Sequence, residues 1–387
     1  MGVSICLSMI VKDEAHVVAE SLTCVAPYID TWVVVDTGSS DDTIEIIRTF
    51  FAARGIPGEV HERPWSNFGV NRSEALDLCQ GRADYIWVMD ADDLVVGALD
   101  FTNLKLDSYL LRYGSSFRYW RKQVFRSGLK WKYEGVIHEY AVCLDEGTTE
   151  ARLEGDYHIE SRRLGNRNLA PDKYQRDAEI LLDVLSAKPD DARATFYLAQ
   201  SYYDAGEHGL ALKYYGRRSE MGGFGEEVFF SLFRCGECLE LLEEPWERSL
   251  DAYLRAWQSR PGRAEPLHRI ARHYRRAEQY HLALLFADRA SQIPFPDGDV
   301  LFIAASIYEW EIDDELSIVA YYARDYRRSF DVATRLLEVR SVPEPDRERV
   351  LANRDFAAHF VRDDFVFYPE SIIAELRAAS EQPNDRP

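Results

Sequence analysis

The sequence predicts a two-part fold: an α/β domain built on a largely parallel sheet, followed by an all-α region of helical repeats. Two observations lead to this prediction. Up to about residue 160, short apolar runs alternate with segments of helical spacing. Beyond about residue 164, helices alternate with short breaks. The length of 387 residues also fits two domains better than one.

Four strands and three connecting helices are expected in the first part. Three strands are buried apolar or β-branched runs ended by polar residues, at residues 3–11, 31–35 and 85–89, and a less apolar strand is expected at residues 58–61. Helical spacing predicts the connecting helices at residues 14–25, 41–51 and 70–78. Asp41 is expected to cap the second helix. Residues 106–143 have a strand-like pattern again, with Trp and Tyr at intervals.

The second part repeats a loose motif. Phe196-Tyr197-Leu198-Ala199 recurs approximately at residues 230–233, 268–271 and 302–305, and breaks fall near Pro189, residues 221–223, Pro261 and Pro294. This spacing predicts tetratricopeptide-like pairs of helices, with an ordinary helical bundle as the alternative. The expected boundaries are residues 1–160 for the α/β domain, 161–176 for a linker, 177–342 for the repeats and 343–387 for a C-terminal helical segment, with a disordered tail at 380–387.

Composition excludes some classes of partner. A formal net charge of -20 argues against nucleic acid and anionic membranes, but it leaves room for one local basic pocket. The six cysteines show no disulfide framework, and Cys235 and Cys238 are expected on one helix face rather than in a zinc or redox site. No stretch is long enough to span a bilayer and the start lacks a signal-peptide pattern, so we expect a cytoplasmic protein.

The Asp90-Ala91-Asp92 segment is the sharpest candidate for chemistry. It follows the apolar strand predicted at residues 85–89, and ligands of open parallel sheets bind at the carboxyl ends of the strands. Two carboxylates one residue apart can converge on a hard divalent cation whose other ligands are phosphate oxygens. Acidic triplets are also common in solvated turns, which is the alternative interpretation.

Three further segments hold candidate residues. Asp36 directly follows a β-branched strand, where it can bind a nucleobase or ribose or only cap the next helix. Arg72, which follows Asn71 at a predicted helix start, can bind phosphate or lie on the surface. His138 and Glu139 suit a metal ligand and a proton acceptor, but both can serve one site only at a bend. A structural histidine in an aromatic strand is the alternative.

Together these segments resemble the family-two glycosyltransferases, whose nucleotide-sugar domain has the Rossmann-like GT-A fold. The matching segments are residues 8–14, 34–43, 71–76 and 88–93. One branch of this family carries a C-terminal tetratricopeptide-like region. The chain is similar to that branch through residues 131–140, 196–202, 221–227 and 263–267, so the resemblance covers nearly the whole sequence.

The resemblance implies roles for the matching residues. Asp36 would contact the nucleobase, and Asp90 and Asp92 would bind the ribose and the metal-bound diphosphate. His138 would be a metal or diphosphate ligand. Glu139 would be the best candidate for the catalytic base, although the family's usual Glu-Asp base motif is not evident here. The nucleotide-sugar site would also include Val11, Glu14, Asn71 and Arg72.

The resemblance also implies a reaction. A uridine diphosphate sugar is the expected donor and Mn²⁺ or Mg²⁺ the expected cofactor, although Thr37 stands where the family has a second acid. Glu139 would deprotonate an acceptor that attacks and inverts the anomeric carbon, while the cation and Arg72 stabilise the departing diphosphate. Because the first domain is short, the helical arm is expected to hold a protein or peptide acceptor.

Two other classes compete with this interpretation. Nucleotidyltransferases usually have a glycine-rich basic loop after the first strand, whereas residues 10–14 contain no glycine. The other class is a non-catalytic repeat scaffold whose N-terminal domain has degenerated. The presence of Asp36, Asp90, Asp92 and the His138-Glu139 pair argues against that class.

Overall fold

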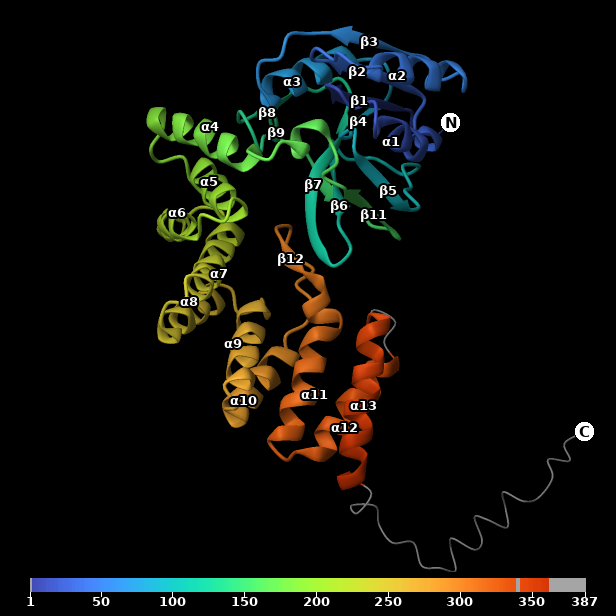
Figure 1. Cartoon of the computed structure of the whole chain (residues 1–387). Coiled ribbons are helices and arrows are strands. Elements are labelled where there is room, and N and C mark those ends of the chain that lie inside the picture. The colour runs from blue at the N-terminus through green and yellow to red at the C-terminus, as the bar shows by residue number, and fades with distance from the viewer. Residues whose placement is uncertain (1, 339–341, 362–387) are drawn as a thin grey trace, which may run out of the picture. The chain divides into compact units, whose positions relative to one another are not determined.

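The computed structural model describes residues 2–338 and 342–361 (Figure 1). Contacts within the chain divide it into two compact units. Among the described residues, the first comprises those up to Pro266 with Phe295–Ala305, and the second comprises Leu267–Pro294 with those from Ser306 onward. The tail expected to be disordered, residues 380–387, lies outside the described residues.

Four parallel strands at one end of the main sheet confirm the expected α/β pattern. Their order is β3-β2-β1-β4, and they are β1 (Ile5–Val11), β2 (Thr31–Asp36), β3 (Gly58–Glu62) and β4 (Tyr85–Val88). The connections contain α1 (Val18–Val25), the short η1 (Ala26–Tyr28), α2 (Thr43–Ala52) and α3 (Phe68–Cys79). The first helix starts later than expected, because residues 14–17 form a turn closed by the Val17 and Val18 amides on the Glu14 carbonyl.

Alternate side chains of the central strands face two different layers. Leu7 and Val34 lie in a core shared with α1 and α2. Cys6 and Val33 lie in a second core, shared with α3 and with the small β8–β9 ribbon. The period of two along a strand therefore explains why apolar runs, rather than alternating sequences, form the centre of this sheet.

The rest of the sheet is mixed: β10 and β11 run parallel to β6, whereas β4–β7, β7–β6 and β11–β5 are antiparallel pairs, which corrects the expectation of a largely parallel sheet. After β4 the order continues β7-β6-β11-β5, and β7 runs antiparallel to both β4 and β6. The connection from β6 to β7 is too short for a parallel crossover. The strands are β5 (Asp93–Gly97), β6 (Ser108–Tyr113), β7 (Phe117–Arg126), β10 (Glu150–Arg152) and β11 (Tyr157–Ser161), with a separate ribbon of β8 (Trp131–Glu134) and β9 (Tyr140–Cys143).

Helices make up most of the described residues after β11, as expected. A short helix, η2 (Asn166–Leu169), falls inside the expected linker. The helices that follow are α4 (Lys173–Ala187), α5 (Ala192–Asp204), α6 (His208–Glu220), α7 (Gly225–Leu241), α8 (Trp246–Ser259), α9 (Glu265–Arg276), α10 (Tyr280–Ser291), α11 (Ile312–Tyr322), α12 (Tyr326–Glu338) and α13 (Glu344–Val361), with the π-helical turn η3 (Ile307–Glu311) before α11. Cys235 and Cys238 both lie buried on α7 without a disulfide.

The prediction of a helix at the start of the fourth repeat is wrong. Residues 302–305 do not start a helix. Instead they contain β12 (Ile303–Ala304), which pairs antiparallel with β7, as Figure 1 shows beside the end of that strand. The Trp120 amide also donates to the Val300 carbonyl at 2.8 Å. A sequence repeat does not reveal this pairing, because backbone hydrogen bonds to a distant strand leave no periodic signal.

Buried ion pairs hold the segment that carries β12. Arg263 is 1 % exposed and contacts Glu265 at 2.7 Å and Asp299 at 3.1 Å. The Glu226 carboxylate accepts from the amides of Val300 and Leu301 at 2.8 and 2.7 Å.

Within the described residues, no helix is both long and apolar enough to cross a membrane.

Candidate active site

A cleft of about 1330 Å³ opens at the carboxyl ends of β1 and β4. Val11 and Asp90 line it from those strand ends, and Tyr197, Phe230 and Phe302 line it from α5, α7 and the segment before β12. Basic side chains outnumber acidic ones among the lining residues, although the whole chain carries a net charge of -20. The structure thus contains the local basic pocket that the composition left open.

Arg72 joins two acids at the centre of this cleft. Its side chain is 6 % exposed; Nη2 pairs with Asp90 Oδ1, and Nε lies 2.6 Å from Glu139 Oε1. Arg121 Nη1 approaches the other Asp90 oxygen at 3.3 Å. Although burial raises it, the charges of Arg72 and Arg121 hold the pKa of Asp90 well below its usual range. The alternative of a surface position for Arg72 is therefore wrong.

A bend between β8 and β9 delivers Glu139 to this arginine. The ribbon closes with Glu134 opposite Tyr140, so the residues between them leave the strand. His138 adopts a φ of 51° in this bend. The bend packs so closely on α3 that a Cβ on Gly69 would lie 2.2 Å from the carbonyl oxygen of Gly135. His138 and Glu139 therefore occupy the bend that one shared site requires, and not an aromatic strand.

The ring of His138 stacks on a helix of the arm. It lies parallel to the Tyr197 ring with a centroid separation of 4.0 Å. Arg193, one turn earlier on α5, donates from Nε and Nη2 to the His138 carbonyl at 3.0 Å each. Surrounding protein and the charges of Arg193 and Arg167 lower the pKa of His138, so the ring is neutral at neutral pH.

Asp92 and Glu14 face the linker that follows β11. Asp92 Oδ2 accepts from the amides of Leu164 and Gly165 at 2.8 and 2.9 Å, and the Glu14 carboxylate accepts from Asn166 N at 3.3 Å. A Cβ on Gly165 would lie 3.2 Å from Glu14 Oε1, so the absence of a side chain lets the loop pass. Burial, opposed by the Asn166 amide and reinforced by Asp92, raises the pKa of Glu14 to about 7.

Two other expected residues, Val11 and Asp36, hold loops around the cleft. The Val11 carbonyl accepts from Thr37, and Val11 itself lines the cleft. Asp36 is buried, and its carboxylate accepts from the amides of Gly38 and Ser39. These bonds fix the turn after β2.

Both polar atoms of the Asn71 side chain form hydrogen bonds within the protein. Oδ1 accepts from Ser66 N at 3.0 Å, and Nδ2 donates to the Pro64 carbonyl and to Glu74. It is completely buried and is not among the residues that line the cleft. Its observed contacts shape the loop before α3, and its role in nucleotide binding stays a prediction.

The three expected metal ligands do not gather into one cluster. Among the described residues, no three His, Cys, Asp or Glu side chains are grouped so that they could hold an ion. The Asp90 oxygens are paired with arginines, and the His138 ring lies on Tyr197. Asp92 keeps one carboxylate oxygen without a protein partner in the described part of the chain. The metal roles of these residues stay predictions, and Asp92 is the best placed of them.

Arg121 and Tyr197 line the cleft, but the sequence did not predict them as site residues. Arg121 lies over the Tyr113 ring at 5.0 Å, and its place in an aromatic strand suggested only packing. Tyr197 was visible as part of a repeated helical motif, whose apolar spacing indicated core. These contacts depend on segments far apart in the sequence.

Comparison with known proteins finds a family match for the N-terminal segment of the chain. Residues 6–97 match the family model described as glycosyl transferase family 2. The N-terminal part of the chain is a family-two glycosyltransferase domain. The matched segment of this domain contains Asp36, Arg72, Asp90 and Asp92 and ends before Glu139. No curated protein matches the chain.

Solved structures similar to the chain include tetratricopeptide-repeat proteins. The C-terminal part of such a protein from Cytophaga hutchinsonii is 16% identical, over 48% of this chain and 67% of that chain, with a TM-score of 0.38. YrrB, described as a TPR protein with an unusual peptide-binding site, is 12% identical over 48% of this chain and 84% of that chain, with a TM-score of 0.35. MamA from Desulfovibrio magneticus is 11% identical over 44% and 88%, with a TM-score of 0.34. In this chain, helices α4 to α13 follow the segment matched by the family model.

Proposed function

We propose that this glycosyltransferase moves a sugar, with inversion, from a nucleoside diphosphate sugar to a protein or peptide acceptor. A uridine diphosphate sugar is the donor we expect. The observation that carries the proposal is the buried Arg72, which holds Asp90 and Glu139 together at the strand ends of a family-two domain. Strand-end clefts are where open α/β sheets bind nucleotides.

The charge of the cleft supports an anionic donor. Lys12, Arg163 and Lys173 line it in addition to the arginines paired with Asp90. A cleft with an excess of one sign of charge concentrates ligands of the opposite sign, even on a protein whose net charge repels them. A nucleoside diphosphate is such a ligand, so the local charge favours donor binding.

A divalent cation, Mn²⁺ or Mg²⁺, is the expected cofactor of this site. The donor set fits an ion bound mainly through its substrate, because Mg²⁺ is commonly held by one or two carboxylates together with phosphate oxygens and water. Asp92 would supply the protein ligand through the oxygen that the linker amides leave free. When bound, the cation would neutralise negative charge on the diphosphate leaving group.

Glu139 is positioned to take the acceptor proton. Arg72 holds Oε1, and Oε2 has no hydrogen-bond partner among the described residues. In the proposed step, Oε2 accepts the proton of an acceptor hydroxyl as its oxygen bonds to the anomeric carbon. The bond from that carbon to the diphosphate oxygen breaks, and the electron pair leaves with the diphosphate. Attack opposite the leaving group inverts the configuration.

The helical side of the cleft offers room for the acceptor. Tyr197 and Gln200 from α5 and Phe230 and Arg234 from α7 line it opposite the sheet. This wall mixes aromatic, amide and charged groups from two helices, and grooves on stacked helix pairs suit extended peptides. A protein or peptide acceptor is therefore our proposal for this wall.

Incubation of the full chain with several nucleotide sugars and Mn²⁺ tests the proposal through release of nucleoside diphosphate. Glu139→Gln should lower the release by about 100-fold or more, because general-base catalysis contributes about that much. Glu134→Gln, on the same ribbon but outside the cleft lining, should behave as wild type. Equal rates for both variants would remove Glu139 as the base. No release with any donor would favour the scaffold interpretation.

A further inference from the structure

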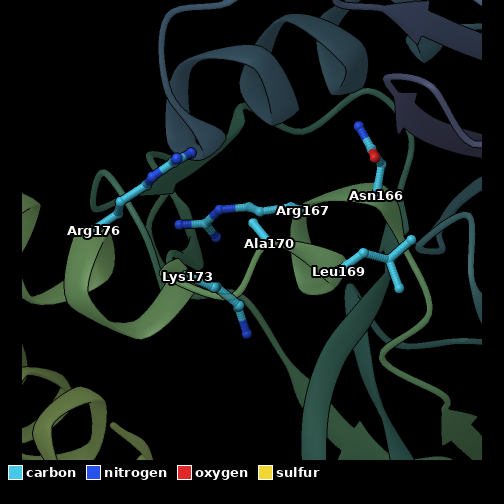
Figure 2. Close-up of a pocket in the computed structure, with 6 residues that line it drawn as sticks. All are labelled: Asn166, Arg167, Leu169, Ala170, Lys173 and Arg176. Carbon is cyan, nitrogen blue, oxygen red and sulfur yellow. The ribbon is translucent and has the colours of Figure 1, made fainter.

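A side pocket of about 370 Å³ lies where the linker enters α4 (Figure 2). Its six lining residues include three cations and no acid: Asn166, Arg167, Leu169, Ala170, Lys173 and Arg176. Figure 2 shows these side chains, which come from η2, from Ala170 just after it and from the first turn of α4. Four of the six also line the main cleft, so the side pocket adjoins it.

Arg167 is held in a fixed orientation. Its Nη2 pairs with Asp177 Oδ1, and Asp177 is 2 % exposed. Its guanidinium lies 4.8 Å above the ring of Phe68, the first residue of α3. A guanidinium has five N–H donors, so one carboxylate leaves several of them for a ligand. Such pre-orientation reduces the entropy lost when an anion binds.

Lys173 is the unpaired cation of the pocket. In the described part of the chain no carboxylate forms an ion pair with it, and its recorded contact is with the Tyr174 ring at 4.6 Å. Burial lowers the pKa of Lys173; the Asp177 charge raises it, and Arg167 and Arg163 lower it. A half-buried ammonium among other cations is unfavourable by itself, and a bound anion would relieve this repulsion.

Arg176 adds less to the pocket. It pairs with Asp172 one turn earlier at 2.7 Å, and both side chains are largely exposed. The pocket therefore presents one oriented guanidinium and one free ammonium. Arginine binds phosphate through its fork and lysine as a point charge, and the two together match the oxygens of a phosphate group.

We propose that this side pocket is a phosphate-binding site in which Arg167 and Lys173 hold a phosphate of a ligand that occupies the adjoining cleft. The site itself is independent of any reaction. Only the source of the phosphate rests on the proposed function: it is the diphosphate of the nucleotide or a phosphate carried by the acceptor. Both sources place the same oxygens against the same two side chains.

Calorimetric titration of the full chain with inorganic pyrophosphate, in metal-free buffer, tests the site. Lys173→Ala should weaken pyrophosphate binding by about tenfold or more, as expected for loss of a charged hydrogen bond. Lys188→Ala is the matched control, because it removes the same charge at the other end of α4, outside both pockets. Arg167→Lys should also weaken binding, while it keeps a charge beside the buried Asp177.

A second titration distinguishes the two sources. Loss of pyrophosphate binding in the chain saturated with uridine diphosphate would assign the site to the nucleotide. Retained, Lys173-dependent pyrophosphate binding in that complex would assign it to a second ligand. If uridine diphosphate does not bind at all, Lys173-dependent pyrophosphate binding still supports the site, although the proposed donor fails. Equal pyrophosphate affinities for Lys173→Ala and Lys188→Ala would overturn the site.

Discussion

At the scale of single residues, Arg72 organises the candidate active site. One guanidinium fixes Asp90 at the end of β4 and Glu139 in the β8–β9 bend. A charge this deeply buried is stable only with its partners, and removal of one partner leaves the others uncompensated. The Arg72 side chain thus links Asp90, at the strand end where the sugar donor is proposed to bind, to the proposed base Glu139.

Arg72→Lys should lower nucleoside diphosphate release by about tenfold or more, because an ammonium cannot bond two carboxylates with the fixed geometry of a guanidinium. Circular dichroism should show a folded chain, since the charge is retained. Arg82→Lys serves as control, because Arg82 pairs with Glu59 away from the cleft. An Arg72→Lys variant with full turnover would contradict the positioning role.

Asp92→Asn should abolish the Mn²⁺-dependent part of uridine diphosphate binding. The amide keeps one oxygen for the amides of Leu164 and Gly165, so the linker contact can survive while the charge that attracts a cation is lost. Titration with and without Mn²⁺ measures the effect. An unchanged response to Mn²⁺ would place the cation elsewhere.

His268 should make the second unit sensitive to acid. It is 3 % exposed, and burial together with Arg272 and Arg269 lowers its pKa to about 3. The His268 ring is therefore protonated more easily in the unfolded chain than in the folded one. The stability that the neutral ring contributes to the fold is complete above pH 6.5 and is lost as the pH falls towards 3. At pH 5 the loss is about 2 kcal/mol.

The thermal unfolding of His268→Leu between pH 7.5 and pH 5 tests this prediction. The variant should lose less stability on acidification than wild type, because it has no proton to gain on unfolding. His281→Gln changes an exposed histidine and should keep the wild-type pH dependence. Identical pH profiles for wild type and His268→Leu would show that the histidine does not titrate in this way.

At the scale of elements, the segment Phe295–Ala305 completes the cleft. It leaves the repeat after α10, pairs β12 with β7 and places Phe302 against Phe117 at a ring distance of 5.5 Å. Arg263 supports it by donating to the Phe302 carbonyl at 2.7 Å. The end wall of the cleft is therefore built by a segment that the repeat pattern assigned to a helix.

Arg263→Ala should destabilise the first unit by about 3–5 kcal/mol, the typical effect of breaking a buried ion pair. Glu265 and Asp299 would remain buried without their common cation. Chemical denaturation measures the change. Arg255→Ala removes an exposed arginine from α8 and should have almost no effect. A similar stability for both variants would show that the buried pairs do not anchor the segment.

At the scale of the whole molecule, the glycosyltransferase domain and the first helices of the arm share one core. Ile137 of the β8–β9 bend packs with Leu181 and Leu185 of α4 and Leu198 of α5. The contacts accordingly place the first helices in the same compact unit as the sheet. The bend between β8 and β9, which carries the proposed base Glu139, thus depends on α4 and α5 for its packing.

A chain ended at residue 172 should fail to bind uridine diphosphate, because the bend would lose the helices that bury Ile137. A chain ended at residue 305 keeps the whole first unit and should retain binding. Calorimetry on both proteins, with limited proteolysis to report folding, measures the difference. Equal binding by the two chains would show that the arm serves only the acceptor.

The sequence by itself determined the pattern of the first strands and helices and the strand-end position of Asp36, Asp90 and Asp92. These features follow from local periodicity, because a period of two or of 3.6 depends only on neighbouring residues. The same signal identified the helical region after β11. It also located His138 and Glu139 as a pair, without a way to decide whether they stand in a strand or at a bend.

Only the tertiary structure decided how these parts meet. The burial of Arg72 between Asp90 and Glu139, the stacking of His138 on Tyr197 and the pairing of β12 with β7 join segments separated by many residues. Such contacts depend on which surfaces are left to bury once the local elements have formed. That is a property of the packed chain, which no local pattern contains.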